Sequence, residues 1–225
     1  LSRSRVTGLV PNTMLQTAST GGDTKIRETE YTKLIDADVL HREGISGDGV
    51  GVAVVDTGIW QSKALKKDTN GRQRIAAYFD ATVSGDDGSE MSDASGHGTH
   101  ISSVIVSSFP SYDDNDQPTG SYHGVAPDAD LVVVKAFDEN GQGTYADVIR
   151  GISYVIDNKD KHNIRVMNLS FSGEPMSHYW EDPINIAVME AWKAGIVVVA
   201  SAGNSGPDPL SIGVPGNVPY VVTVG

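Results

Sequence analysis

The sequence predicts an α/β protein with a doubly wound parallel sheet and helices on both faces, and three observations lead to this prediction. Four short, valine-rich apolar runs have the length of strands. Helical patterns lie between the runs, and most of the runs end in a polar or glycine-rich turn. Continuous apolar runs are typical of parallel strands covered on both faces, and their alternation with helices is typical of the doubly wound class.

The expected elements can be placed along the chain. The strands are expected at 50–55, 131–134, 165–169 and 196–200, with a last one at 220–224. The helices are expected at 30–43, 101–106, 144–157 and 183–193. In the helix at 30–43, Leu34, Ile35, Val39 and Leu40 have helix-like spacing.

The first 29 residues differ from the rest of the chain. They are polar, lack apolar periodicity and contain Gly21-Gly22. We therefore expect residues 1–29 to form an extended N-terminal arm, and residues 30–225 to form one folded domain. A length of 225 residues suits a single α/β domain with a sizeable core.

Composition excludes several classes of protein. The formal net charge is −12 and no basic stripe is present, so we expect no nucleic-acid partner. The chain has no cysteine, which excludes disulfides and a thiolate nucleophile. No apolar run is long enough to span a bilayer, so we expect no membrane partner.

Polar residues gather just after the predicted strands. Asp56, the turn at Ser170 and Asn204 each follow one of them, and ligands of such sheets bind at the carboxyl ends of the strands. His97 lies between two glycines at the expected start of a helix, where an imidazole can act as a general base. Asp56 is a candidate to orient that base, and Asn204 to donate to a developing oxyanion.

Plainer interpretations of the same residues remain open. Asp56 suits a turn or a helix cap, and Asn204 suits a left-handed turn. His97 and His100 form a His-x-x-His pair, but the sequence marks no third metal ligand.

Four motifs, in order, resemble the subtilisin-like serine proteases (subtilases). They are Val54-Val55-Asp56-Thr57-Gly58-Ile59, Gly96-His97-Gly98-Thr99-His100, Gly124-Val125-Ala126-Pro127 and Ala202-Gly203-Asn204. The resemblance covers residues 37–225. It implies an endopeptidase that cleaves polypeptide substrates through an acyl-enzyme, and a secreted, extracellular protein.

The resemblance also implies residue roles. Asp56 orients His97, His97 serves as general base and then general acid, and Asn204 donates to the oxyanion. The substrate-binding residues implied by the resemblance lie in three segments: Gly141 and Gly143; Ser170, Phe171 and Ser172; and Ser201, Ala202 and Gly203. Ser172 stands where relatives often have glycine, so we expect it to narrow the primary specificity pocket.

One feature of the family is missing. Its nucleophilic serine lies in a Gly-Thr-Ser-Met-Ala motif, which this sequence does not contain. We therefore expect a catalytic domain that is incomplete at its C-terminus and inactive alone, with a C-terminal fragment carrying the serine as a candidate partner. The resemblance makes the arm a candidate pro-segment remnant. The alternative is a non-catalytic, subtilase-like module that binds peptides.

The chemistry implied by the resemblance requires no cofactor, but structural calcium is compatible with the sequence. The loop holding Asp113, Asp114 and Asp116 lies where relatives carry a calcium-binding loop, and carboxylate oxygens suit calcium. A second calcium site of many relatives takes an aspartate from the region of residues 61–65, which here contains none.

Overall fold

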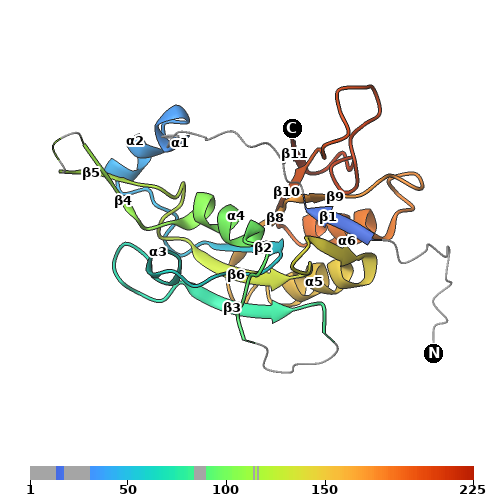
Figure 1. Cartoon of the computed structure of the whole chain (residues 1–225), viewed down its shortest axis with the longest axis horizontal. Helices are drawn as coiled ribbons and strands as arrows, with labels where there is room; N and C mark the ends of the chain where they lie inside the picture. Colours follow the sequence, from blue (N-terminus) through green and yellow to red (C-terminus); the bar gives the residue numbers. More distant parts are fainter. Residues whose placement is uncertain (1–13, 18–30, 84–89, 114, 116) are drawn as a thin grey trace.

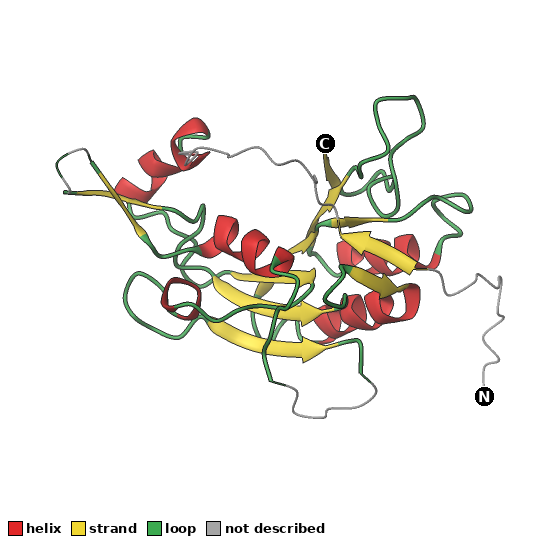
Figure 2. Ribbon diagram, viewed as in Figure 1, coloured by secondary structure: helices red, strands yellow, loops and turns green. Residues whose placement is uncertain are grey.

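The computed structural model describes residues 14–17, 31–83, 90–113, 115 and 117–225. Its main feature is a six-stranded sheet with the order β11-β10-β8-β2-β6-β3, in which all neighbours run parallel. The strands are β2 (Gly51–Asp56), β3 (Ile75–Asp80), β6 (Asp130–Lys135), β8 (Ile164–Leu169), β10 (Val197–Ser201) and β11 (Val222–Val224). Figures 1 and 2 show helices packed on both faces of this sheet.

The central strand β2 is buried on both faces. Ala53 and Val55 belong to one apolar cluster, which includes residues of α5 (Tyr145–Asp157) and α6 (Pro183–Lys193). Val52 and Val54 belong to a second cluster, which includes residues of α4 (His97–Val106). Successive side chains of a strand point to opposite faces, so a continuous apolar run has to be covered twice. The prediction of a doubly wound sheet is confirmed.

The two long helices begin at clear capping signals. Thr144 and Asp147 form a capping box at the start of α5. Asp182 accepts hydrogen bonds from two backbone amides of α6, and Pro183 occupies its first position. Both arrangements satisfy amides that have no partner inside the helix, so the sequence places these two helices correctly.

The helix expected at 30–43 is wrong in detail. The chain forms two short helices, α1 (Tyr31–Leu34) and α2 (Ala37–Arg42), separated by Asp36, whose φ of 57° is left-handed. The apolar residues behind the prediction are exposed, with Leu34 80% and Ile35 61% accessible. The face that packs inward includes Ala37 and His41 instead.

Two smaller sheets complete the fold. β4 (Pro110–Tyr112) and β5 (Pro118–Tyr122) form a hairpin, and α2 packs against β5. β1 (Met14–Thr17), from the N-terminal arm, lies between β7 (Gln142–Thr144) and β9 (Phe171–Ser172) and runs antiparallel to both (Figure 1). The short helix α3 (Lys63–Lys66) follows β2.

The described part of the chain contains no helix long and apolar enough to cross a membrane. The rest of the arm, including Gly21-Gly22, lies outside the described residues.

Candidate active site

The strand order brings several of the predicted site residues to one edge of the sheet. β10, β8 and β2 are consecutive neighbours and run parallel, so their carboxyl ends lie along the same edge. Asp56 is the last residue of β2, Ser170 follows β8, and residues 202–204 follow β10. His97 reaches this edge from the first turn of α4.

Asp56 and His97 are hydrogen-bonded. The distance between Asp56 Oδ1 and His97 Nδ1 is 2.7 Å, and the two side chains are 1% and 13% exposed. Asp56 Oδ1 also accepts from the Thr57 amide at 2.7 Å. An ionised carboxylate only accepts, so His97 Nδ1 is the donor, and in the neutral imidazole the lone pair is then on Nε2. This tautomer is the one that a general base requires.

Glycines allow the two segments that carry this pair to touch through their backbones. A Cβ atom on Gly98 would lie 2.4 Å from the carbonyl oxygen of Gly58. Gly58 itself has a φ of 117°, and a Cβ there would lie 2.0 Å from the Ser92 carbonyl oxygen. Such separations leave no room for any side chain, so the glycines of both motifs have a steric role.

Asp93 is a site residue for which the sequence suggested no role. Its Oδ1 accepts from Thr57 Oγ1 and the Gly96 amide, each at 2.8 Å. Its Oδ2 accepts from the Thr99 amide at 2.8 Å and from Thr99 Oγ1 at 2.5 Å. Burial acts to raise the pKa of Asp93, but these hydrogen bonds outweigh it and lower the pKa below its usual value. The signal in the sequence was an acidic residue shortly before a helix start, where the helix dipole favours negative charge.

The predicted substrate-binding segments on β7 and β9 flank an extended strand. Leu15 is opposite Gly143, Gln16 is opposite Ser172, and Thr17 is opposite Phe171. Adding a strand between two exposed edges is a common way of binding a peptide, because the backbone supplies the affinity. The structure therefore shows a segment of this chain held as an extended peptide.

The glycines predicted beside the strand have different roles. Gly141 has a φ of 70° and closes a turn in which Asp138 accepts from the backbone amides of Asn140 and Gln142. Gly143 lies on β7, where a Cβ atom would lie 2.3 Å from the Ala136 carbonyl oxygen. Both positions therefore restrict the residue to glycine.

Ser172 fills the space between two further glycines. Its Oγ lies 2.5 Å from the position of a Cβ atom on Gly203 and 2.0 Å from that of one on Gly213. The hydroxyl on β9 thus lies between two glycines of the segment that follows β10. That Ser172 narrows the primary specificity pocket stays a prediction.

The remaining predicted residues lie nearby in the sequence. Ser201 ends β10, and its Oγ accepts from the Gly203 amide at 3.0 Å. Ala202 and Gly203 are half-buried, whereas Asn204 is exposed on the loop that follows. Ser170 accepts from Asn168 Nδ2 at 2.8 Å.

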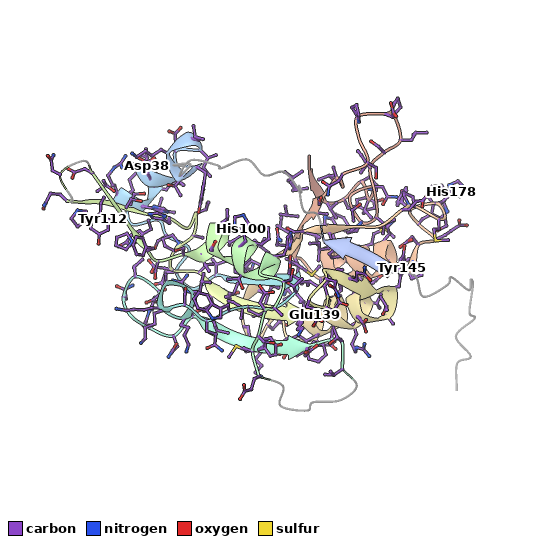
Figure 3. All side chains as sticks on the ribbon, viewed as in Figure 1. Asp38, His100, Tyr112, Glu139, Tyr145 and His178 are labelled. Atoms are coloured by element: carbon purple, nitrogen blue, oxygen red, sulfur yellow. The ribbon has the colours of Figure 1, made fainter. Side chains whose placement is uncertain are left out.

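Tyr145 joins the two edges that flank β1. Its hydroxyl donates to Asp182 Oδ2 at 2.9 Å, linking the start of α5, after β7, to the cap of α6, beyond β9. Burial, together with the negative charge of Asp182, raises the pKa of Tyr145. Figure 3 shows Tyr145 at the end of the molecule where β1 lies, and His178 on the loop that leads to α6.

The metal interpretations concern His100 and the loop that holds Asp113. His100 is exposed on α4, and the described residues contain no group of three or more His, Cys, Asp or Glu side chains that could hold a metal ion. Asp113 Oδ1 accepts from the backbone amides of Asn115 and Gln117, which lower the pKa of Asp113. Asp114 and Asp116 lie outside the described residues.

Comparison with known proteins identifies relatives over most of this domain. The model of the subtilase family matches residues 47–225. The chain is 40% identical over 193 residues to serine protease AprX of Bacillus subtilis, which covers 83% of this chain and 40% of AprX. It is 35% identical over 194 residues to subtilisin DY of Bacillus licheniformis, covering 85% of this chain and 61% of that protein.

A fungal relative extends the match. The chain is 30% identical over 210 residues to a cuticle-degrading serine protease of Arthrobotrys oligospora, covering 93% of this chain and 45% of that protein. The chain thus spans between 40% and 61% of the length of these relatives.

Proposed function

Since the chain belongs to the subtilase family, we propose that it supplies the acid–base and substrate-binding parts of a serine endopeptidase. The observation that carries this proposal is the 2.7 Å hydrogen bond between Asp56 and His97 at the carboxyl end of β2. A carboxylate, an imidazole and a serine hydroxyl in series are the elements of nucleophilic catalysis by serine proteases. The reaction is hydrolysis of a peptide bond in a polypeptide substrate.

Each residue has a defined part in the proposed reaction. His97 Nε2 takes the proton of the serine hydroxyl as its oxygen attacks the peptide carbonyl carbon, and then gives that proton to the leaving amine. Asp56 keeps Nδ1 protonated and stabilises the imidazolium that forms. Asn204 donates its side-chain amide to the oxyanion of the tetrahedral intermediate. Water then repeats the sequence on the acyl-enzyme with His97 again as base.

The serine belongs to a segment that this sequence does not contain, either further along a longer protein or on a separate fragment. β11 is the outermost strand of the sheet and pairs with β10. Its apolar side chains remain exposed, with Val222 53% and Val224 56% accessible. Trp192 and Tyr220 stack beside them at a ring separation of 4.9 Å. Exposed apolar surface of this kind supports packing of a further segment against β11.

Substrate recognition is proposed to follow the pairing that β1 makes. A peptide lying between β7 and β9 would replace Met14–Thr17 strand for strand. We accordingly assign residues 1–29 to a pro-segment or N-terminal extension whose described part occupies the substrate-binding edges. The alternative, a non-catalytic peptide-binding module, would use the same edges but has no use for a hydrogen-bonded Asp56–His97 pair.

The test measures hydrolysis and covalent labelling together. The purified chain, alone and mixed with a downstream fragment carrying the Gly-Thr-Ser-Met-Ala motif, is assayed with a fluorogenic peptide and a serine-directed phosphonate probe. We expect no hydrolysis by the chain alone, hydrolysis by the mixture, and labelling confined to the added fragment. His97→Ala should abolish both signals, whereas the exposed His100→Ala should preserve them.

Two results would contradict the proposal. Labelling of the chain alone would mean that a serine within these 225 residues is the nucleophile. Peptide binding by the mixture with neither hydrolysis nor labelling would favour the non-catalytic module.

Extracellular location and structural calcium are further parts of the proposal. Location is drawn from the family and is tested by fractionating the source organism with an antibody against the chain. Calcium is assigned to the loop at Asp113, Asp114 and Asp116, which precedes β5. No cofactor is assigned to the chemistry itself.

A further inference from the structure

We infer that Asp93 is a positioning residue that holds the end of β2 against the first turn of α4 and thereby fixes the Asp56–His97 hydrogen bond. The role of that pair rests on the proposed function. The inference concerns how the chain keeps the two side chains in place, and it follows from a set of hydrogen bonds around the Asp93 carboxylate.

Two threonines cross-link the segments that carry the pair. Thr57 follows Asp56 directly, and its Oγ1 accepts from the Gly98 amide, directly after His97, at 2.9 Å. Thr99 belongs to α4, and its Oγ1 accepts from the Trp60 amide, beyond the end of β2, at 2.8 Å. Each segment thus presents a hydroxyl oxygen to a backbone amide of the other.

Asp93 orients both hydroxyls. A threonine hydroxyl has a single hydrogen, and both Thr57 and Thr99 donate theirs to Asp93, at 2.8 and 2.5 Å. Their oxygen lone pairs then face the amides of Gly98 and Trp60. If Asp93 were absent, each hydroxyl would be free to rotate, and the cross-links would lose their preferred direction.

The carboxylate also fixes the turn that delivers His97. Asp93 accepts from the amides of Gly96 and Thr99, which flank His97 at the start of the helix. These amides lack partners inside the helix, and an anion at this end is favoured by the helix dipole. The backbone on both sides of His97 is therefore tied to the same carboxylate that holds Thr57.

The steric contacts fix the separation of the two segments but not their relative direction. The backbones meet at Gly58 and Gly98, where a Cβ atom on Gly98 would lie 2.4 Å from the Gly58 oxygen and 3.2 Å from Asp56 Cβ. Contact at this distance fixes how close the segments come, but it does not prevent sliding or rotation. The hydrogen bonds that converge on Asp93 supply that restriction.

The primary experiment observes the Asp56–His97 hydrogen bond directly in the complete 225-residue chain. In proton NMR of protein with ¹⁵N-labelled histidine, the His97 Nδ1 proton should give a resonance downfield of the amide region. We expect Asp93→Ala to abolish or strongly broaden this resonance and Thr57→Val to weaken it. Asp93→Asn, which keeps one acceptor oxygen, should have an intermediate effect and serves if the alanine variant does not fold.

The matched control is Asp68→Ala. Asp68 likewise accepts hydrogen bonds from backbone amides, those of Asn70 and Arg72, and from the Arg72 side chain, but none of these partners belongs to β2 or α4. The Asp68→Ala variant should lose about as much stability as Asp93→Ala but retain the resonance of the His97 Nδ1 proton. Retention in every variant, or loss in Asp68→Ala as well, would overturn the inference.

Kinetics give a second readout in the reconstituted enzyme of the proposed function. A misplaced base impairs the chemical step more than substrate binding, so Asp93→Ala should lower kcat by about 10- to 100-fold while KM stays within about twofold. A rise in KM alone would contradict a positioning role. The NMR result stands without hydrolysis, so failure of the proposed function and failure of this inference are distinguishable.

Discussion

The active-site end of α4 and the outer lobe formed by α1, α2, β4 and β5 are held together in different ways. At the active-site end, backbone touches backbone at Gly58 and Gly98, and Asp93 ties the two segments together. In the outer lobe, one imidazole provides much of the attachment between α2 and the hairpin, and apolar side chains such as Leu34 remain 80% exposed. Figure 3 shows Asp38 and Tyr112 in this lobe, at the opposite end from Tyr145 and His178.

The imidazole of the outer lobe belongs to His41. The Tyr122 amide donates to its Nδ1 at 3.3 Å, so Nδ1 is an acceptor and Nε2–H donates to the Val125 carbonyl at 3.0 Å. Ser121 Oγ also approaches Nδ1 at 3.1 Å. In the lobe, several hydrogen bonds therefore meet at one side chain, His41, which acts as the hub of the lobe. In the active site, several separate hydrogen bonds link the end of β2 to the start of α4 and restrict the motion of one against the other in several directions. Keeping Asp56 and His97 in a fixed relative position requires cross-links of the kind found in the active site.

The largest expected effect comes from adding a methyl group where backbones touch. Gly58→Ala places a Cβ atom 2.0 Å from the Ser92 oxygen at a φ of 117°, so we expect a loss of about 4 kcal/mol in the free energy of unfolding, or failure to fold. The control is Gly44→Ala beside the outer lobe, where φ is 80° and no atom lies within 4 Å. It should cost about 1 kcal/mol, which urea denaturation resolves. Equal losses would mean that the contact at Gly58 relaxes.

Removing the hub of the outer lobe should have the next largest effect. His41→Ala leaves the Tyr122 amide and Ser121 without their acceptor, and we expect a loss of about 2–3 kcal/mol in the free energy of unfolding. His123→Ala is the control, because this exposed histidine contacts only the ring of Phe109 among the contacts described. A loss confined to the control would refute the role of His41 as hub.

Lowering the pH should weaken the active-site region, because the hydrogen bonds of Asp93 depend on its negative charge. Its pKa is lower in the folded chain than in the unfolded one, so its stabilisation is fully present above the unfolded pKa of about 3.9 and is lost as pH falls through the lower folded value. We expect Asp93→Asn to cost about 1–2 kcal/mol at pH 7 and to approach wild type below about pH 4. Stability curves of the two proteins that stay parallel down to pH 3 would contradict this assignment.

Chelation should produce the smallest effect. Asp113 already accepts two backbone hydrogen bonds in the hairpin turn, so calcium bound at this loop should add little to the stability of the outer lobe. We expect the melting temperature to fall by no more than about 2 °C when a chelator is added, in line with under about 1 kcal/mol. A larger fall that calcium reverses, and that Asp113→Asn removes, would show that the lobe depends on the ion.

The parallel core was predictable because its signal is local. The runs that form β2 and β6 are apolar on both faces, and few arrangements besides a covered parallel sheet produce this pattern. β3 was missed because Ile75–Asp80 lies at the edge of the sheet and is only half-buried along most of its length. In α1 and α2, the helical spacing of apolar residues suggested a buried face. The residue that packs inward and forms hydrogen bonds is His41, and nothing in the sequence indicates these partners.

The site also contains residues that the local sequence predicts and residues whose role depends on contacts between distant segments. The pairing of Asp56 with His97 was predictable, since one follows a buried strand and the other lies between two glycines at a helix start. Asp93 was not, because its importance depends on Thr57, 36 residues away in the chain, and on Thr99 being brought to the same carboxylate. Placement of β1 between β7 and β9 was equally hidden, because strand pairing over such separations leaves no periodic trace in the sequence.

β1 is tethered to the rest of the chain through residues 18–30, and this tether bears on how a free peptide would compete with β1 for β7 and β9. Because Met14–Thr17 belongs to the same polypeptide as β7 and β9, its pairing with them is a unimolecular event. Short tethers hold a ligand at an effective concentration on the order of millimolar. A free peptide that paired with these edges equally well would have to reach a similar concentration to displace half of the strand. If peptides bind at these edges as proposed, the intact tether would exclude dilute peptides by mass action, and a single cut in it would remove that threshold.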